Sequence, residues 1–161
     1  MPRTPTLTLV GLALASALSG CSSALDAAPE APLEGEGSEA CGVLLDDLVE
    51  GPVLADVAES DDLTGRTAAF GDGLLAVTCG VAEPAGLEPT SECDDVRGIG
   101  WYVDDAELSD PDSAITATAI GVRPRVAVVF SPEARGDVSL ATLSALADPV
   151  REHLEVVQDC L

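Results

Sequence analysis

The hydrophobic positions around residue 40 repeat with the period of an α-helix. Within 39–50, apolar side chains recur at spacings of three and four residues, and acidic side chains lie between them. The apolar set is Cys41, Leu44, Leu45 and Leu48. This spacing places the set on one face, which predicts a helix packed against a core. Ser38 is the expected N-cap, and Gly51-Pro52 is expected to end the helix.

Four later segments have short apolar runs or alternation that is typical of β-strands. They are residues 74–81, 98–104, 114–120 and 125–130. In the last segment, alternation predicts Val126, Val128 and Phe130 on the core side, with Arg125 and Ala127 on the other side. Residues 82–95 contain two prolines and several turn formers, which predict a loop.

The C-terminal segment returns to a helical period. Its apolar stripe consists of Leu140, Leu143, Ala147, Val150, Leu154 and Val157. Ser139 or Asp137 could cap this helix, and Asp148-Pro149 predicts a kink or two abutting helices, because proline lacks the backbone donor. The element order therefore predicts an α+β fold: an antiparallel sheet of about four strands, flanked by an N-terminal helix and a kinked C-terminal helix.

The first twenty residues have the features of an export signal. Arg3 precedes an apolar stretch at 7–18, and Leu18-Ser19-Gly20-Cys21 matches a bacterial lipobox. We expect cleavage before Cys21 and acylation of its thiol, with palmitate among the acyl chains. The alternatives are a plain secretory signal with a cysteine at the junction, and an uncleaved anchor, for which the stretch is short. The predicted organisation is a signal peptide at 1–20, an acidic disordered tether at 21–38, and one domain at 39–161.

The charge of the chain restricts its partners. The sequence has no lysine, seven arginines and 29 acidic residues, for a formal net charge of −22. Such a surface repels phosphate backbones, so a nucleic-acid partner is not expected. The acidic residues either form a solvated surface or attract cations or a basic partner. The expected location is the extracytoplasmic face of the cell membrane, with the lipid as the membrane contact.

The remaining cysteines are expected to form disulfides, because an even number in an exported domain is typical of such bonds. With Cys21 assigned to lipid, four remain, and three pairings are possible. We favour Cys79–Cys93, which would close the proline-rich loop, and Cys41–Cys160, which would join the ends of the domain. A zinc site is the rival use, but the spacing has no C-x-x-C pair.

The sequence contains no catalytic or cofactor-binding motif that we can identify, so we assign no catalytic residue, cofactor or metal ligand. His153 is the single histidine and is interpreted as a surface residue. Paired aspartates recur, and a loop cluster from Asp104 to Asp112 could bind a divalent ion weakly. Solvated loop is the favoured interpretation, because adjacent carboxylates point in different directions.

Two places could bind a small ligand. Arg123 and Arg125 flank Pro124 and, if extended, share a face on which they could clamp a carboxylate or phosphate. They could equally neutralise nearby acids on the sheet, and that structural role is the favoured interpretation. Trp101 and Tyr102 point to opposite sides of a strand, so one ring is expected in the core and the other outside. Core packing of Trp101 is favoured over a role as a binding platform.

Three segments together resemble a known family. They are Ala68-Ala69-Phe70-Gly71-Asp72, Val77-Thr78-Cys79-Gly80-Val81, and Val96-Arg97-Gly98-Ile99-Gly100-Trp101. In order and spacing they resemble an actinobacterial family of secreted or membrane-anchored envelope proteins, catalogued as a domain of unknown function. Here Phe70, Gly73 and Thr78 replace the usual tryptophan, proline and basic residue. The resemblance implies a location and a fold, and it implies no catalytic residue.

These observations support two functional hypotheses. The first is a lipid-anchored, non-enzymatic binding or accessory module of the cell envelope, with an envelope protein or cell-wall partner. The alternative is an envelope enzyme that acts on a small acidic or cell-wall substrate through acidic residues and an arginine clamp.

Overall fold

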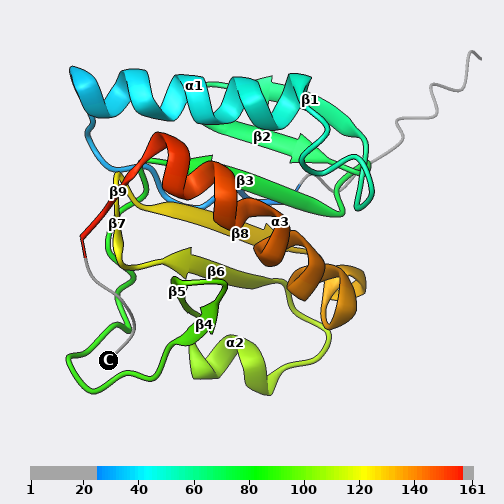
Figure 1. Cartoon of the computed structure of the whole chain (residues 1–161). Coiled ribbons are helices and arrows are strands. Elements are labelled where there is room, and N and C mark those ends of the chain that lie inside the picture. Colours follow the sequence, from blue (N-terminus) through cyan, green and yellow to red (C-terminus); the bar gives the residue numbers. More distant parts are fainter. Residues whose placement is uncertain (1–24, 158–161) are drawn as a thin grey trace, which may run out of the picture.

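Helices α1 (Glu36–Glu50) and α3 (Asp137–His153) lie side by side on one face of an antiparallel sheet (Figure 1). The structure is a computed structural model that describes residues 25–157. Cys21 and the predicted signal peptide therefore lie outside the described residues. The α+β class predicted from the sequence is confirmed.

Within the described residues, the main sheet has seven strands in the order β1-β2-β3-β8-β6-β5-β4. The four predicted strands are confirmed as β3 (Leu75–Cys79), β5 (Ile99–Tyr102), β6 (Ile115–Ala119) and β8 (Val126–Phe130). Three strands were not predicted: β1 (Ser60–Thr64), β2 (Thr67–Phe70) and β4 (Asp94–Val96). β1 and β4 are the edge strands. Their acidic sequences lack the apolar alternation from which a strand is predicted, and charged residues are common on edge strands.

Smaller elements complete the fold. A short helix α2 (Asp105–Ser109) follows β5, and a 3₁₀ turn, Pro132–Ala134, follows β8. Strands β7 (Val122–Arg123) and β9 (Glu155–Val156) form a separate two-stranded sheet. No helix within residues 25–157 has the length and apolar character needed to cross a membrane.

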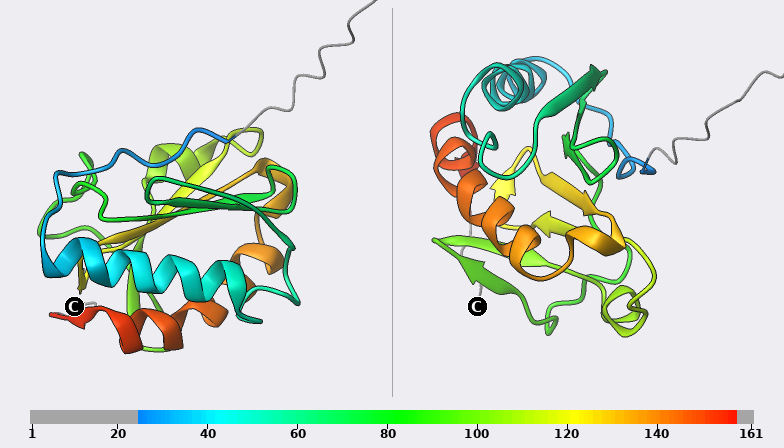
Figure 2. Two further views of the ribbon diagram at one scale, coloured as in Figure 1. Left: turned by 90° about the horizontal axis from the view of Figure 1, so that it is seen from above. Right: turned by 90° about the vertical axis from the view of Figure 1, so that its right-hand side faces the viewer.

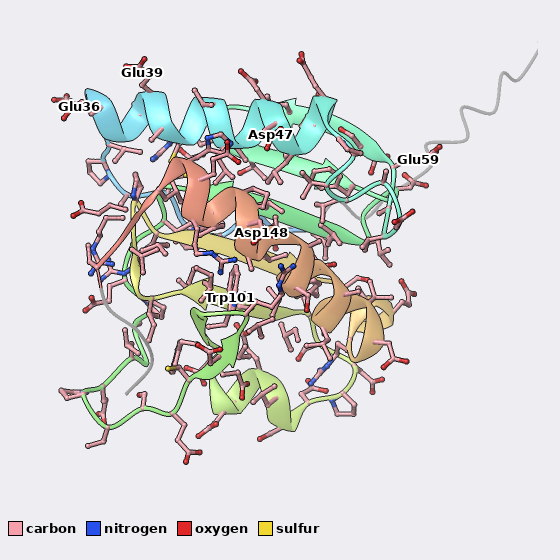
Figure 3. All side chains as sticks on the ribbon, in the orientation of Figure 1. Glu36, Glu39, Asp47, Glu59, Trp101 and Asp148 are labelled. Carbon is pink, nitrogen blue, oxygen red and sulfur yellow. A yellow bond between two sulfur atoms is a disulfide. The ribbon has the colours of Figure 1, made fainter. Side chains whose placement is uncertain are left out.

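The core lies between the two long helices and the sheet. The predicted α1 stripe is buried, as are the predicted core residues of β8. They pack with Leu75, Val77, Phe70 and Trp101 in one apolar cluster. Trp101 is 1 % exposed, so its predicted place in the core is confirmed. It lies in the layer beneath α3, whereas Glu36 and Glu39 project from the solvent side of α1 (Figure 3).

Helix α3 differs from its predicted pattern. It runs as a single helix with Pro149 inside it, so two abutting helices do not occur. Leu140 is 58 % exposed, and Val157 is also exposed. The helix ends at His153 and the chain then becomes extended, so Val157 does not continue the stripe. Thr142 and Leu146 are buried in their place.

The predicted end of α1 at Gly51 is confirmed, but the predicted N-caps of both long helices are wrong. Each long helix begins after a glycine with positive φ, Gly35 before α1 and Gly136 before α3, and neither has a side-chain cap. Ser38 lies inside the first turn of α1 because the helix begins earlier than predicted. Ser139 instead donates a hydrogen bond to the carbonyl of Gly136.

The disulfide pairing predicted from the sequence is corrected. Cys41 is bonded to Cys79, with a Cα–Cα distance of 5.4 Å, so neither Cys79–Cys93 nor Cys41–Cys160 forms. The reason is tertiary: α1 packs across β3, which places the inward-facing Cys41 directly over the inward-facing Cys79. Cys93 is also disulfide-bonded, and Cys160 lies outside the described residues.

Candidate functional site

The face of the sheet opposite α1 and α3, the outer face, carries a row of polar side chains. Strand pairing aligns Tyr102 with Thr118, Thr118 with Ala127, and Ala127 with Thr78. The adjacent row on the inner face contains Trp101 and Cys79. Because side chains alternate along a strand, one sheet carries an apolar side and a hydroxyl-rich side.

An N-terminal segment, 28–33, crosses this outer face, and we name it the strap (Figure 2, right). The Ala31 N–H donates to the Gly80 carbonyl at 2.8 Å, and the Ala82 N–H donates to the Pro29 carbonyl at 3.2 Å. Ala28 packs with Val81, Ala127 and Val129 in a second small apolar cluster. This part of the expected disordered tether therefore contacts the domain. It also explains why the outward-facing Ala127 is buried.

Arg66 fastens the strap to the sheet. Its Nη2 donates to Glu30 Oε2 at 2.9 Å and to the Ala31 carbonyl at 2.6 Å. Its Nη1 donates to the Gly80 carbonyl at 3.1 Å. One guanidinium thus joins the strap to the residues that follow β3. The hydrogen bond to Glu30 is charge-assisted on both sides.

A groove of about 410 Å³ lies between the strap and the loop that contains α2, and we name it the acidic groove. Its polar lining includes Tyr102, Asp104, Glu107, Thr116 and Thr118. Its apolar lining includes Ala28, Val81 and Ala127. A hollow of about 360 Å³ adjoins it and shares Gly86, Tyr102 and Asp104. Across the strap, a third hollow of about 630 Å³ lies over β1, β2 and β3.

Two of the three carboxylates that line the groove are held by backbone groups. Asp104 is the N-cap of α2, and its Oδ1 accepts a hydrogen bond from the Ala106 N–H at 2.8 Å. Glu107 Oε2 accepts from the Thr116 N–H at 2.6 Å. Each carboxylate therefore uses one oxygen to hold its position, and Asp104 also forms a hydrogen bond with the Tyr102 phenol.

Arg135 positions the loop that carries these carboxylates. Its guanidinium donates to the carbonyls of Ser113 at 3.1 Å and Leu108 at 3.2 Å, and also to the carbonyl of Asp110. These carbonyls lie at and beyond the C-terminal end of α2, where positive charge is favourable. The groove wall is thereby tied to the segment that follows β8.

Tyr102 is the buried polar side chain at the junction of the two hollows. Burial is the largest cause that raises the pKa of its phenol above 10.0, followed by the charges of Asp104 and Asp105 and a hydrogen bond with Asp104. Gly86 faces this pair: a Cβ there would overlap Asp104 Oδ2 and lie 2.8 Å from the Tyr102 hydroxyl. Glycine thus lets the 82–93 loop close against the phenol and carboxylate.

Arg123 and Arg125, considered from the sequence as a possible clamp, have different partners. Arg123 belongs to β7 and turns back to the carbonyls of Ile120 at 2.9 Å and Val122 at 2.7 Å. Arg125 precedes β8 in the other sheet and forms an ion pair with Glu83 at the groove rim. Burial, and then the charge of Arg123, lower the pKa of Arg125, while Glu83 raises it. The two side chains are occupied by different partners because they belong to different sheets.

Trp101 is enclosed in the core and does not reach the outer face, so its predicted alternative role as a ligand platform is not supported. Tyr102, expected outside, is turned outward but only 7 % exposed. His153 lies 3.4 Å from Asp47 Oδ2 and connects α3 to α1. Among the described residues, no group of three or more acidic, histidine or cysteine side chains converges as a metal site would require.

Thr116 and Thr118 were not predicted as site residues, and Asp104 was considered only as part of a loop cluster. The sequence did indicate that Thr116 and Thr118 share one face of a strand, because they alternate with alanines in a predicted strand. Nothing in the sequence indicated that this strand lies beside Tyr102.

Comparisons with known proteins identify the family. A family model described as "Protein of unknown function (DUF3515)" matches residues 4–158. No curated protein and no solved structure matches the chain.

Proposed function

Since this chain belongs to the DUF3515 family, whose description names no activity, we propose a function from its anchor signal and its groove. It is a lipid-anchored, non-enzymatic binding module on the extracytoplasmic face of the cell membrane, and the acidic groove is its binding site. The lipobox that ends at Cys21 supports the anchor. Acyl chains on that cysteine would hold the domain at the membrane through the segment that leads into the strap.

The observation that carries the binding proposal is the construction of the groove. Asp104 and Glu107 are each fixed by a backbone hydrogen bond, and Arg135 fixes the loop between them and β6. An apolar lining with a few positioned polar groups is the usual composition of a small-ligand site. The volume of about 410 Å³ is also within the range of such sites.

The alternative was an envelope enzyme that holds an acidic substrate between Arg123 and Arg125. The contacts of these side chains do not support it, because Arg123 binds backbone carbonyls and Arg125 binds Glu83. The polar groups that line the groove are carboxylates, hydroxyls and a phenol, which suit binding of a hydrogen-bond donor better than an acidic substrate.

A matched pair of variants tests the binding site. Gly86→Trp places a bulky ring against Asp104 and Tyr102, whereas Gly42→Trp places the same ring on open surface of α1. Lipidated full-length protein of each kind is immobilised from detergent and exposed to a solubilised envelope fraction. We expect wild-type and Gly42→Trp proteins to retain the same component, and Gly86→Trp to lose most of it. Equal retention by all three proteins, or chemical conversion of the retained component, contradicts the proposal.

The anchor is tested separately in cells. Cys21→Ala removes the acceptor of the lipid, so the protein should leave the membrane fraction or accumulate with its signal uncleaved. Cys93→Ala, which alters a cysteine within the domain, should leave membrane attachment unchanged. A Cys21→Ala protein that is processed and membrane-bound as in wild type would show that the anchor is assigned incorrectly.

A further inference from the structure

We infer that the outer face of the sheet is the side of the domain that lies against the membrane, because the strap shortens the connection to the lipid to a few residues. This inference rests on the proposed function, since it takes Cys21 as the lipid-bearing residue and adds which surface faces the headgroups. Two observations carry it: the place where the described chain first contacts the domain, and the number of residues before that contact.

The described chain begins on the outer face. Leu25 is partly buried and packs against the small apolar cluster of Ala28, Val81, Ala127 and Val129. It also lines the hollow over β1, β2 and β3. Helices α1 and α3 lie on the opposite side of the sheet (Figure 2, right). The first contact of the chain with the domain is therefore on the face that the helices do not cover.

Several interactions of different kinds hold the strap in place after this first contact. Ala28 is 6 % exposed, and a backbone hydrogen bond joins Ala31 to Gly80. Arg66 binds Glu30 and the Ala31 carbonyl, and its side chain is only 20 % exposed, so solvent screens the ion pair incompletely. Release of the strap would break all these contacts together. The strap is therefore a fixed attachment point on the domain.

Only residues 22–24, which we name the membrane linker, separate Cys21 from Leu25. Four Cα steps of a fully extended chain span at most about 14 Å. A free tether over 21–38, as the sequence alone predicts, would span up to about 60 Å and about 20–25 Å on average. Acyl chains can enter the hydrocarbon only if Cys21 is at headgroup level, so Leu25 lies within about 14 Å of the headgroups.

The charge of this face indicates that the linker, and not adhesion, keeps it near the membrane. The hollow beside Leu25 is lined by Glu30, Asp61, Asp62 and Asp72. Carboxylates are repelled by anionic headgroups and have no net charge to bind on neutral ones. A longer membrane linker should therefore let the domain move away, whereas an adhesive face would stay in place. This difference makes the length of the linker the variable to test.

The test compares one insertion at two places in the lipidated full chain. A Gly-Ser segment of about twelve residues has an average span of about 17–21 Å. One variant carries it between Ser23 and Ala24, before the strap. The other carries it between Glu34 and Gly35, two exposed positions after the strap. If the strap is fixed, only the first insertion lengthens the connection between lipid and domain; if the strap is free, both do.

The distance to the membrane is read by energy transfer from a dye on an introduced lysine. The chain has no lysine, so each variant has a single side-chain amine. Asp62→Lys places the dye beside the hollow that Leu25 lines, and Glu39→Lys places it on the solvent side of α1 (Figure 3). Each replaces one exposed acid, so the charge change is the same. The wild-type chain, labelled identically, gives the background. Preformed phosphatidylcholine vesicles carry an acceptor dye on a fraction of their headgroups.

We expect the Asp62→Lys dye to transfer energy about twice as efficiently as the Glu39→Lys dye, because α1 alone adds about 10–12 Å of thickness. The insertion before the strap should remove about half of the Asp62→Lys transfer, and the insertion after the strap should leave it unchanged. Equal losses from both insertions overturn the inference, because the strap would not hold the membrane-bound chain. Equal transfer from the two dyes also overturns it, because neither face would be turned to the membrane.

Hydrogen exchange gives a second measurement on the same vesicles. The Ala31 amide, which bonds the strap to the sheet, should be as protected in the vesicle-bound wild-type chain as in detergent. Loss of this protection on the vesicles overturns the inference independently of the insertions.

The outcomes distinguish this inference from the proposed function. Flotation with the vesicles reports the lipid anchor, and a wild-type chain that does not float refutes the anchor and this inference together. A chain that floats but fails the insertion comparison keeps its anchor and overturns only the orientation. The binding proposal is decided separately by the Gly86→Trp and Gly42→Trp proteins.

Discussion

The two faces of the main sheet are built from the same strands but have opposite characters. The inner face is covered by α1 and α3, is almost entirely apolar, and is crossed by the Cys41–Cys79 disulfide. The outer face is covered in part by the strap and the 82–93 loop, carries hydroxyl side chains, and is hollowed on both sides of the strap. Trp101 and Tyr102 are neighbours in β5, yet one is sealed in the core and the other borders the groove.

This contrast assigns stability and binding to different sides of one scaffold. The inner face can supply most of the hydrophobic free energy, because two long helices exclude water from it. The outer face can keep buried hydroxyls and carboxylates, since the sheet beneath it is already stabilised from the other side. Substitutions on the two faces should therefore differ in kind, and the following predictions run from the largest expected effect to the smallest.

Trp101→Ala should have the largest effect on the inner face. It removes the largest fully buried side chain and leaves a cavity, which should lower the free energy of unfolding by about 3–5 kcal/mol. Tyr102→Phe, one residue along on the outer face, should cost about 1 kcal/mol. Both free energies of unfolding should be measured by urea denaturation with circular dichroism. Tryptophan fluorescence cannot be used for both variants, because Trp101→Ala removes the single tryptophan. Comparable costs would remove the distinction between the faces.

Loss of the Cys41–Cys79 bond should be the next largest effect. The bond joins residues 38 positions apart, and the chain-entropy estimate for a loop of that length is about 4 kcal/mol. The double variant Cys41→Ala, Cys79→Ala should show this loss in urea denaturation. Reductant alone is not an equivalent test, because Cys93 is also disulfide-bonded. A double variant as stable as wild type would mean that helix packing alone holds α1 on the sheet.

Arg66→Gln should loosen the outer face without disturbing the inner one. It removes charge-assisted hydrogen bonds from a largely buried guanidinium, with an expected cost of about 1–2 kcal/mol. Hydrogen exchange should speed up at the Ala31 and Ala82 amides, which bond the strap to the sheet. The amides of β8 should keep their protection. Arg97→Gln, at a more exposed ion pair with Asp148, is the matched control and should leave the strap amides unchanged.

The smallest effect concerns the ionisation of Tyr102, the single tyrosine. Its absorbance should titrate above pH 10.0 in the folded protein, because burial and then Asp104 disfavour the phenolate. The folded pKa is raised, so this stability contribution is complete below the unfolded pKa near 10 and is lost as pH rises through the folded pKa. Asp104→Asn should lower the pKa of Tyr102, and Asp112→Asn should not change it. The unfolded protein in denaturant gives the reference titration.

Most elements that bury an apolar face were predictable from the sequence, although β2, which buries Ala68 and Phe70, was not. The α1 stripe, the four central strands and the buried side of β8 follow directly from hydrophobic periodicity. The edge strands β1 and β4 escaped prediction because their aspartates carry no apolar pattern. Leu140 and Val157 were assigned to the α3 stripe from spacing, although the helix packs on the sheet only between these two residues.

The candidate site was much less predictable. Arg123 and Arg125 were singled out because they are close in sequence, and their separation into two sheets removed the clamp. Asp104, Thr118 and Gly86 were not singled out as a site, because each is ordinary in its own segment. They become neighbours of Tyr102 only through strand pairing and the return of the 82–93 loop.

Local periodicity is therefore sufficient for the helices, the central strands and the α+β class, because each depends on side chains a few residues apart. The lipobox at Cys21 is equally local, and its consequence for location remains a prediction. The Cys41–Cys79 bond, the strap and the acidic groove depend on which elements lie against each other. Sequence spacing carries no distance between residues in different elements, so these features required the packing of α1 over β3 and of residues 28–33 across the outer face.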